Sequence, residues 1–149
     1  MATIEFRSLN DTPSFVLRDR IPEGPLREHI GESELDNEVR VYFAGGLSNL
    51  QMFEAALEPN CGPEPHAHHE DEIVYVLEGE MRFGRRVLGP GDCAHIPAYT
   101  LYSFRAGPQG LRFLNFRARA NGVFISKEEL LALRKKGGPE AGQEGGRKS

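Results

Sequence analysis

The chain of 149 residues has the length of one domain, and with 39% hydrophobic residues it can bury a core without disulfide or metal support. Its net charge of −4 gives no reason to expect nucleic acid or an anionic membrane as a partner. No apolar run approaches the roughly 20 residues of a membrane span. The N-terminus lacks a signal-peptide pattern, so we expect a cytoplasmic protein in which Cys61 and Cys93 are free thiols.

Short apolar runs separated by Gly and Pro turns predict an all-β chain with many short strands, of the sandwich or barrel type. The expected strands, in chain order, are residues 14–17, 39–43, 50–57, 72–77, 81–83, 93–96, 101–104 and 112–116. The expected turns between them lie at residues 59–60, 78–79, 84–85, 89–92 and 107–108. Residues 20–38 are polar and predict a long loop or arm, with room for a short helix near Leu26 to Ile30.

One helix is expected at residues 126–136, where Ser126 and Glu129 form a capping-box pattern. Gly137, Gly138 and Pro139 end it, and residues 137–149 lack apolar content, which predicts a disordered tail. The chain therefore divides into N-terminal strands and an arm (1–39), a barrel core (40–125), the helix (126–136) and the tail (137–149).

The candidate metal ligands lie in the stretch from Pro65 to Gly79. On an extended strand alternate side chains share a face, so His66 and His68 point the same way, and Glu72 opens the next apolar strand. Two imidazoles and one carboxylate that converge form a 2-His-1-carboxylate arrangement, which suits Fe(II), Mn(II), Ni(II), Zn(II) or Co(II) and leaves open coordination positions. We expect His66, His68 and Glu72 to be metal ligands.

These residues resemble a known family. His66-x-His68, three residues, Glu72, six residues and Gly79 are similar to the first motif of the cupin superfamily, G-x5-H-x-H-x3-4-E-x6-G. The second motif, G-x5-P-x-G-x2-H-x3-N, is half present: Gly91 and Pro97 match, whereas Tyr99, Tyr102 and Ala106 replace its Gly, His and Asn. Over about residues 40–117 the resemblance implies a jelly-roll β-barrel of two packed antiparallel sheets, with one divalent metal inside near one end, and frequent homodimers.

Tyr102 stands where the family has its fourth ligand, and three interpretations stay open: a phenolate ligand, a hydrogen-bond donor or general acid/base near the metal, or a packing residue. His95 cannot share the register of that ligand and is expected to be a packed or hydrogen-bonded structural histidine. Arg82, Arg112 and Arg117 alternate with apolar neighbours. This pattern favours solvent-facing arginines over an inward arginine that clamps a substrate carboxylate.

The expected function is a mononuclear divalent-metal protein that acts on a small organic substrate. An Fe(II) dioxygenase is favoured because of the triad. A metal-dependent lyase, isomerase or polyketide-cyclase-type enzyme with Tyr102 as a proton shuttle is one alternative, and a non-catalytic cupin that binds a metal or small molecule is another. We expect a homodimer that contacts neither nucleic acid nor membrane.

Overall fold

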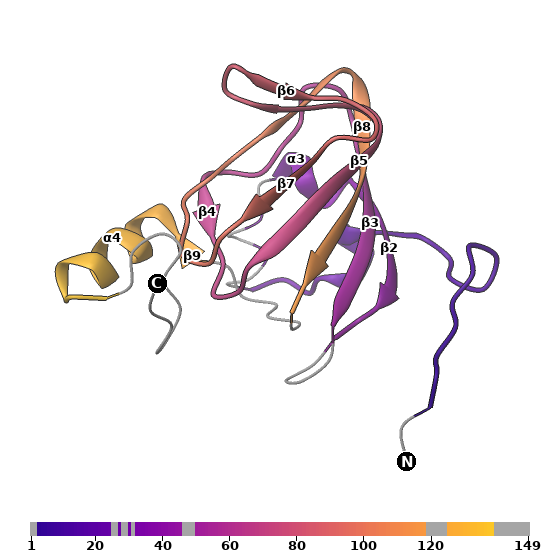
Figure 1. Ribbon diagram of the computed structural model, residues 1–149, viewed down its shortest axis with the longest axis horizontal. Coiled ribbons are helices and arrows are strands. Elements are labelled where there is room, and N and C mark those ends of the chain that lie inside the picture. The colour runs from indigo at the N-terminus through magenta and orange to yellow at the C-terminus, as the bar shows by residue number, and fades with distance from the viewer. Residues whose placement is uncertain are drawn as a thin grey trace.

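A computed structural model describes residues 3–24, 27, 30, 32–45, 50–118 and 125–138. Strands dominate it, as predicted (Figure 1). In chain order the elements are β1 (Phe15–Val16), α1 (Leu17–Arg20), α3 (Glu32–Leu35), β2 (Glu38–Phe43), β3 (Gln51–Leu57), β4 (His66–Ala67), β5 (Glu72–Phe83), β6 (Arg86–Leu88), β7 (Cys93–Ile96), β8 (Arg105–Arg117), β9 (Ile125–Ser126) and α4 (Lys127–Lys135).

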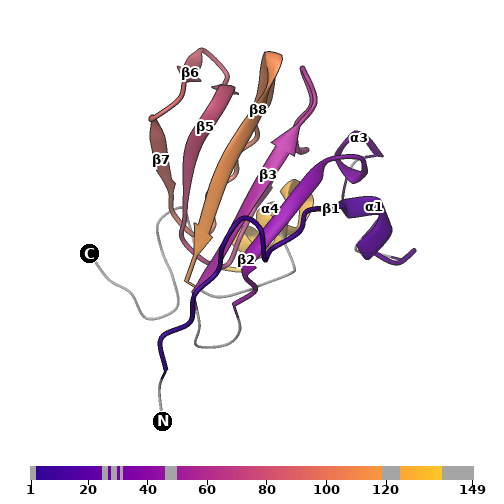
Figure 2. The same ribbon diagram turned by 90° about the vertical axis from the view of Figure 1, so that its right-hand side faces the viewer.

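The main structure is one antiparallel sheet of seven strands in the order β1-β2-β3-β8-β5-β6, in which β7 also pairs with β5. Figure 2 shows this order from β7 and β5 across to β2, with α1 and α3 beyond the β2 edge. A second sheet of two strands, β4 and β9, lies apart from it. The resemblance implied two packed antiparallel sheets; in the described ranges the second consists of these two short strands.

Strand β5 runs through the turn that was expected at residues 78–79. Its first residues alternate between buried and exposed, with Glu72, Val74 and Val76 turned inward. Between Val76 and Met81 the register with β8 shifts twice, which lets the strand continue through Gly79 instead of reversing. Gly79 has φ +75°, and a Cβ there would lie 2.1 Å from the carbonyl oxygen of Gly110.

Strand β8 likewise continues through residues 107–108, where a turn was expected, and extends to Arg117. The turn prediction was wrong at both places, because each strand continues through an irregularity in the register: Gly79 pairs with Leu111 and Met81 with Ala106, and residues 107–110 lie between these pairs. The strand expected at residues 101–104 is reduced to a single bridge between Tyr102 and His66. The hairpin at Gly84-Arg85 is confirmed, since Phe83 pairs with Arg86.

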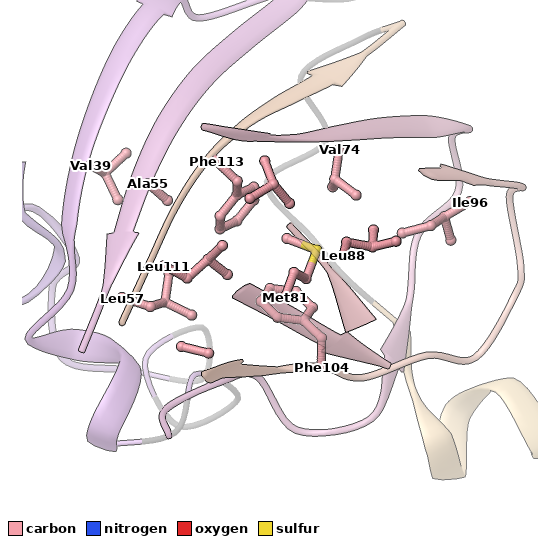
Figure 3. Packing of buried hydrophobic residues seen from close by; sticks show 12 residues of the cluster. Val39, Ala55, Leu57, Val74, Met81, Leu88, Ile96, Phe104, Leu111 and Phe113 are labelled. Carbon is pink, nitrogen blue, oxygen red and sulfur yellow. The ribbon is translucent and has the colours of Figure 1, made fainter. Parts of the chain in front are cut away.

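The core lies on the inner face of the large sheet. Figure 3 shows side chains from β2, β3, β5 and β8 packed together with Leu88 of β6, Ile96 of β7 and Phe104. Val74, Val76 and Met81 of β5 are fully buried. This apolar packing surrounds the place where the inward side chains at the start of β5 and the end of β8 meet.

Helix α4 has the predicted capping box: Ser126 Oγ accepts from the Glu129 amide, and the Glu129 carboxylate accepts from the Ser126 amide. It ends where expected, because Gly137 adopts φ +78° and the Gly138 amide donates to Leu133 O. Residues 139–149, most of the predicted tail, lie outside the described residues, as does most of the segment near Leu26. None of the described helices combines the length and apolarity that crossing a bilayer requires.

Candidate functional site

The two predicted histidines share one face of the chain. His66 is in β4 and His68 follows it; both side chains are buried, and their ring centroids lie 4.9 Å apart in an edge-to-face arrangement. The backbone carbonyl of Glu64 accepts a hydrogen bond from His66 Nδ1 at 2.7 Å, which fixes the orientation of that ring. The alternation expected from the extended motif is therefore confirmed.

Tyr102 reaches the histidines through the backbone. Its amide and carbonyl exchange hydrogen bonds with those of His66, at 2.9 and 3.0 Å, so the two residues stand opposite each other. The ring centroids of Tyr102 and His66 are 4.6 Å apart, and the ring of Phe104 stacks near the phenol. The Tyr102 hydroxyl donates to Glu72 Oε1.

Glu72 is the most deeply buried charge at the site, with an exposed fraction of 1%. Three side chains donate to its carboxylate. The Tyr102 hydroxyl donates to Oε1, and Oε2 accepts from Asn115 Nδ2 at 2.9 Å and from Arg117 Nε at 3.0 Å. His68 Nε2 lies 3.8 Å from Oε1. The carboxylate is thus held by two neutral donors and one cation.

Arg117 points into this site, contrary to the expectation of a solvent-facing arginine. It pairs with Glu72 in the register of β5 and β8, and its side chain is only 13% exposed. Arg117 Nη2 contacts His68 Nε2 at 3.2 Å, and the guanidinium stands 5.6 Å from the centroid of the Phe53 ring. The sequence carried a signal for this orientation: Arg117 has the same strand parity as Phe113, whereas Arg112 has the opposite one.

Burial and the Arg117 charge set the protonation of the site. Burial first, and then Arg117, lower the pKa of His68 to about 3, and burial also lowers the pKa of His66. Burial alone would raise the pKa of Glu72, but Arg117, His68 and the hydrogen-bond donors hold it below its usual value. Burial and the Glu72 charge raise the pKa of Tyr102 well above 10. The site therefore holds neutral imidazoles, a neutral phenol and one ion pair.

A cavity of about 300 Å³ opens beside this cluster. Among the described residues that line it, His66, His68, Tyr102 and Arg117 form the polar end, whereas Glu72 lies behind Tyr102 and Arg117 and does not line it. The apolar walls come from β1, α1, β2, β3 and β8, including Phe15, Leu17, Val39, Val41, Phe53, Ala55 and Phe113. Glu34 of α3 also lines the cavity, and burial raises its pKa to about 7.

As arranged, these residues do not fit a divalent metal ion. The structure brings His66, His68, Glu72 and Tyr102 together, but the guanidinium of Arg117 contacts both the His68 nitrogen and the Glu72 carboxylate that would be ligands. Within the described part of the chain, no three His, Cys, Asp or Glu side chains are grouped as a metal site requires. The raised pKa of Tyr102 also disfavours a phenolate ligand.

The other singled-out residues lie elsewhere. His95 is exposed and hydrogen-bonds Asp71 at 2.9 Å, so it is a hydrogen-bonded rather than a packed histidine and is not a ligand substitute. Cys61 and Cys93 are free thiols, as expected, and Cys93 is exposed. Arg112 binds Glu54 at 2.7 Å, away from the cavity. Arg117 and Asn115, both of β8, join the four predicted site residues through their hydrogen bonds to Glu72.

The fold and a family comparison agree on the class of protein. Residues 53–116, which run from β3 through β8 and include the histidine motif, match the family model of the cupin domain. The chain therefore contains a small cupin domain. No curated protein sequence matches the chain.

Solved structures with this fold include proteins of several kinds. An RmlC-like cupin from Shewanella frigidimarina has 18% identity and a TM-score of 0.57, over 80% of this chain and 94% of its own. The polyketide cyclase RemF from Streptomyces resistomycificus has 21% identity and a TM-score of 0.61, over 89% and 94%. An oxalate decarboxylase mutant from Bacillus subtilis has 19% identity and a TM-score of 0.58, over 97% and 41%. At these identities the likeness concerns the fold alone.

Proposed function

We propose that this cupin binds a small, mainly apolar organic molecule with one hydroxyl or carbonyl group, and holds that group against His66, His68 and Tyr102. The observation that carries the proposal is the cavity of about 300 Å³ with apolar walls and a polar end. Binding sites for small molecules have this composition, in which apolar walls supply affinity and a few polar groups fix orientation.

The chemistry of the polar end favours a neutral hydrogen-bonding head group. His66 Nδ1 donates to Glu64 O and the Tyr102 proton goes to Glu72, so His66 Nε2 and the Tyr102 oxygen are acceptors that suit a ligand hydroxyl. A ligand carbonyl would accept the Tyr102 proton in place of Glu72. Arg117, the cation that lines this end among the described residues, is already paired with Glu72. A bound anion would have to compete with that buried carboxylate.

Binding of 1-naphthol and of naphthalene, followed by fluorescence, tests this proposal. Ala55 lines the cavity, whereas its neighbour Ala56 points to the other face of β3. We expect Ala55→Leu to weaken naphthol binding by at least about tenfold, or roughly 1.4 kcal/mol, because it fills the cavity, and the matched control Ala56→Leu to leave binding unchanged. We expect His66→Ala to weaken binding of 1-naphthol and not of naphthalene. Equal effects of the two leucine variants would place the ligand elsewhere.

A second candidate is an enzyme that moves a proton on such a molecule. The Tyr102 phenol lies beside the His66 imidazole and donates to Glu72, so a proton donor and a proton acceptor line the same wall. The similar structure that is a polyketide cyclase supports a lyase-, isomerase- or cyclase-type reaction here. Deuterium exchange into the methyl group of acetophenone, followed by NMR, is the test: acceleration by the wild type that Tyr102→Phe abolishes would favour turnover.

The Fe(II) dioxygenase that the sequence favoured remains a prediction. It would require Arg117 and Tyr102 to release Glu72, so that His66, His68 and Glu72 could reach one ion. We also propose that the protein is cytoplasmic and pairs with a second copy. The exposed side chains of Ile73, Tyr75 and Phe116, neighbours on the outer face of β5 and β8, support such an interface.

A further inference from the structure

We propose that the guanidinium of Arg117 is the resident cation of this site and takes the place of a divalent metal ion, so that the cavity works without one. This inference does not depend on which molecule the cavity binds. It rests on the contacts that Arg117 makes with His68 and Glu72, and on the way β5 and β8 hold it there.

Arg117 donates a hydrogen bond to the Nε2 lone pair of His68, which a metal ion would need for coordination. An arginine has only donors, so the 3.2 Å contact between Arg117 Nη2 and His68 Nε2 requires Nε2 to be the acceptor. The ring proton of His68 is then on Nδ1, which is the tautomer that would otherwise present Nε2 to a metal ion. An N–H of the guanidinium thus stands where the ion would stand.

Arg117 also neutralises the only carboxylate of the predicted triad. Glu72 accepts from Arg117 at 3.0 Å and from Asn115 at 2.9 Å, and the pair carries no net charge. A divalent ion bound beside it would place two cations against one buried carboxylate, where interactions between charges are weakly screened. An ion that entered from the cavity would meet Arg117 before Glu72, because Arg117 lines the cavity and Glu72 does not.

The position of Arg117 is built into the sheet. Its Cα is paired with that of Glu72 on one side and that of Gln51 on the other, so both neighbouring strands fix the point from which the side chain starts. The ring of Phe53 lies beside the guanidinium. Arg117 ends a strand that has a neighbour on each side, and its side chain is 13% exposed, against 38% for Arg112 on the same strand.

Zinc titration of the full chain, prepared with a chelator and then dialysed, tests the proposal. Affinity is read by competition with a chromophoric chelator. We expect the wild type to bind Zn²⁺ at least about 100-fold more weakly than Arg117→Gln, which removes the charge and keeps a hydrogen-bond donor. The charge-conserving Arg117→Lys should behave like the wild type. The gain in Arg117→Gln should vanish when His68→Ala is added.

The matched control is Arg112→Gln, which removes another arginine of β8 that binds a buried carboxylate away from the cavity. It should leave zinc affinity unchanged. Tight stoichiometric zinc binding by the wild type that His66→Ala abolishes would overturn the proposal. So would an Arg117→Gln variant that folds, by circular dichroism, and gains no affinity.

A second measurement needs no variant. In ¹⁵N-histidine NMR spectra of the wild type, His68 Nε2 should be unprotonated and should keep its chemical shift when equimolar Zn²⁺ is added. A shift of that nitrogen on zinc addition would show that the ion displaces Arg117. This outcome overturns the proposal even if a neutral variant is poorly folded. It does not test the proposed function, which the naphthol-binding experiment tests independently.

Discussion

The ion pair between Glu72 and Arg117 should dominate the stability of the site. Arg117→Met leaves the Glu72 carboxylate, whose side chain is fully buried, without its cation. Removing one partner of a buried pair costs about 3–5 kcal/mol. Tyr102 and Asn115 still donate to the carboxylate, so we expect the lower end, about 3 kcal/mol.

A double-mutant cycle isolates the interaction. Glu72→Gln keeps the size and hydrogen-bonding capacity of the side chain, and Glu72→Gln/Arg117→Met contains no buried unpaired charge. We therefore expect the double variant to be more stable than the sum of the single effects predicts, by about 2 kcal/mol. The assay is urea unfolding followed by circular dichroism at pH 7.

The effect should also depend on pH. Without Arg117, burial raises the pKa of Glu72, so acidification protonates the carboxylate and relieves its unpaired charge. The destabilisation by Arg117→Met should therefore be smaller at pH 5 than at pH 7. Arg112→Met is the matched control, because Arg112 is 38% exposed and its partner Glu54 keeps a second cation, Arg40, at 3.7 Å; it should destabilise by clearly less than Arg117→Met, by about 1 kcal/mol. Additive single effects, or equal effects of the two arginine variants, would refute the reasoning.

Three further predictions concern other parts of the chain. Burial raises the pKa of Glu34 from 4.5 to about 7, so the folded protein loses stability as pH rises through this range and the buried carboxyl must ionise. Glu34→Gln, which cannot ionise, should raise the free energy of unfolding at pH 8 by up to about 3 kcal/mol and should leave it unchanged at pH 4. Gly79→Ala combines a positive φ with a clash against Gly110 and should destabilise by about 3 kcal/mol or more, whereas Gly84→Ala, with positive φ and open space, should cost about 1 kcal/mol. Ile73→Lys should shift the protein toward monomer in sedimentation velocity, and an unchanged distribution would exclude this face as the interface.

Local patterns in the sequence were sufficient for many elements. The apolar run that follows Glu72 predicted a strand at residues 72–77, and β5 begins there. The capping box at Ser126 and Glu129 gave the start of α4, because both hydrogen bonds join residues three positions apart. The motif placed His66 and His68 on one side of the chain. Each of these features depends on neighbours in the sequence, which the residues themselves specify.

Local sequence patterns failed at two glycines, because glycine can either form the turn that ends a strand or lie at an irregularity within a strand. Gly79 and Gly107 were interpreted as turns, yet both lie inside long strands, because the pairing of β5 with β8 passes from Gly79–Leu111 to Met81–Ala106 and skips residues 107–110 of β8. Whether a glycine reverses a strand or bulges within it depends on the partner strand. That partner lies tens of residues away.

The chemistry of the site likewise depends on strand pairing. Glu72 and Arg117 are separated by 45 positions in the sequence and become neighbours only because β5 pairs with β8 in this register. Strand parity showed that Arg117 and Arg112 face opposite ways, but not which way faces the core. The sequence thus provided the imidazoles and the carboxylate, whereas the tertiary structure placed a guanidinium among them, since only the folded sheet brings a distant charge into contact with Glu72.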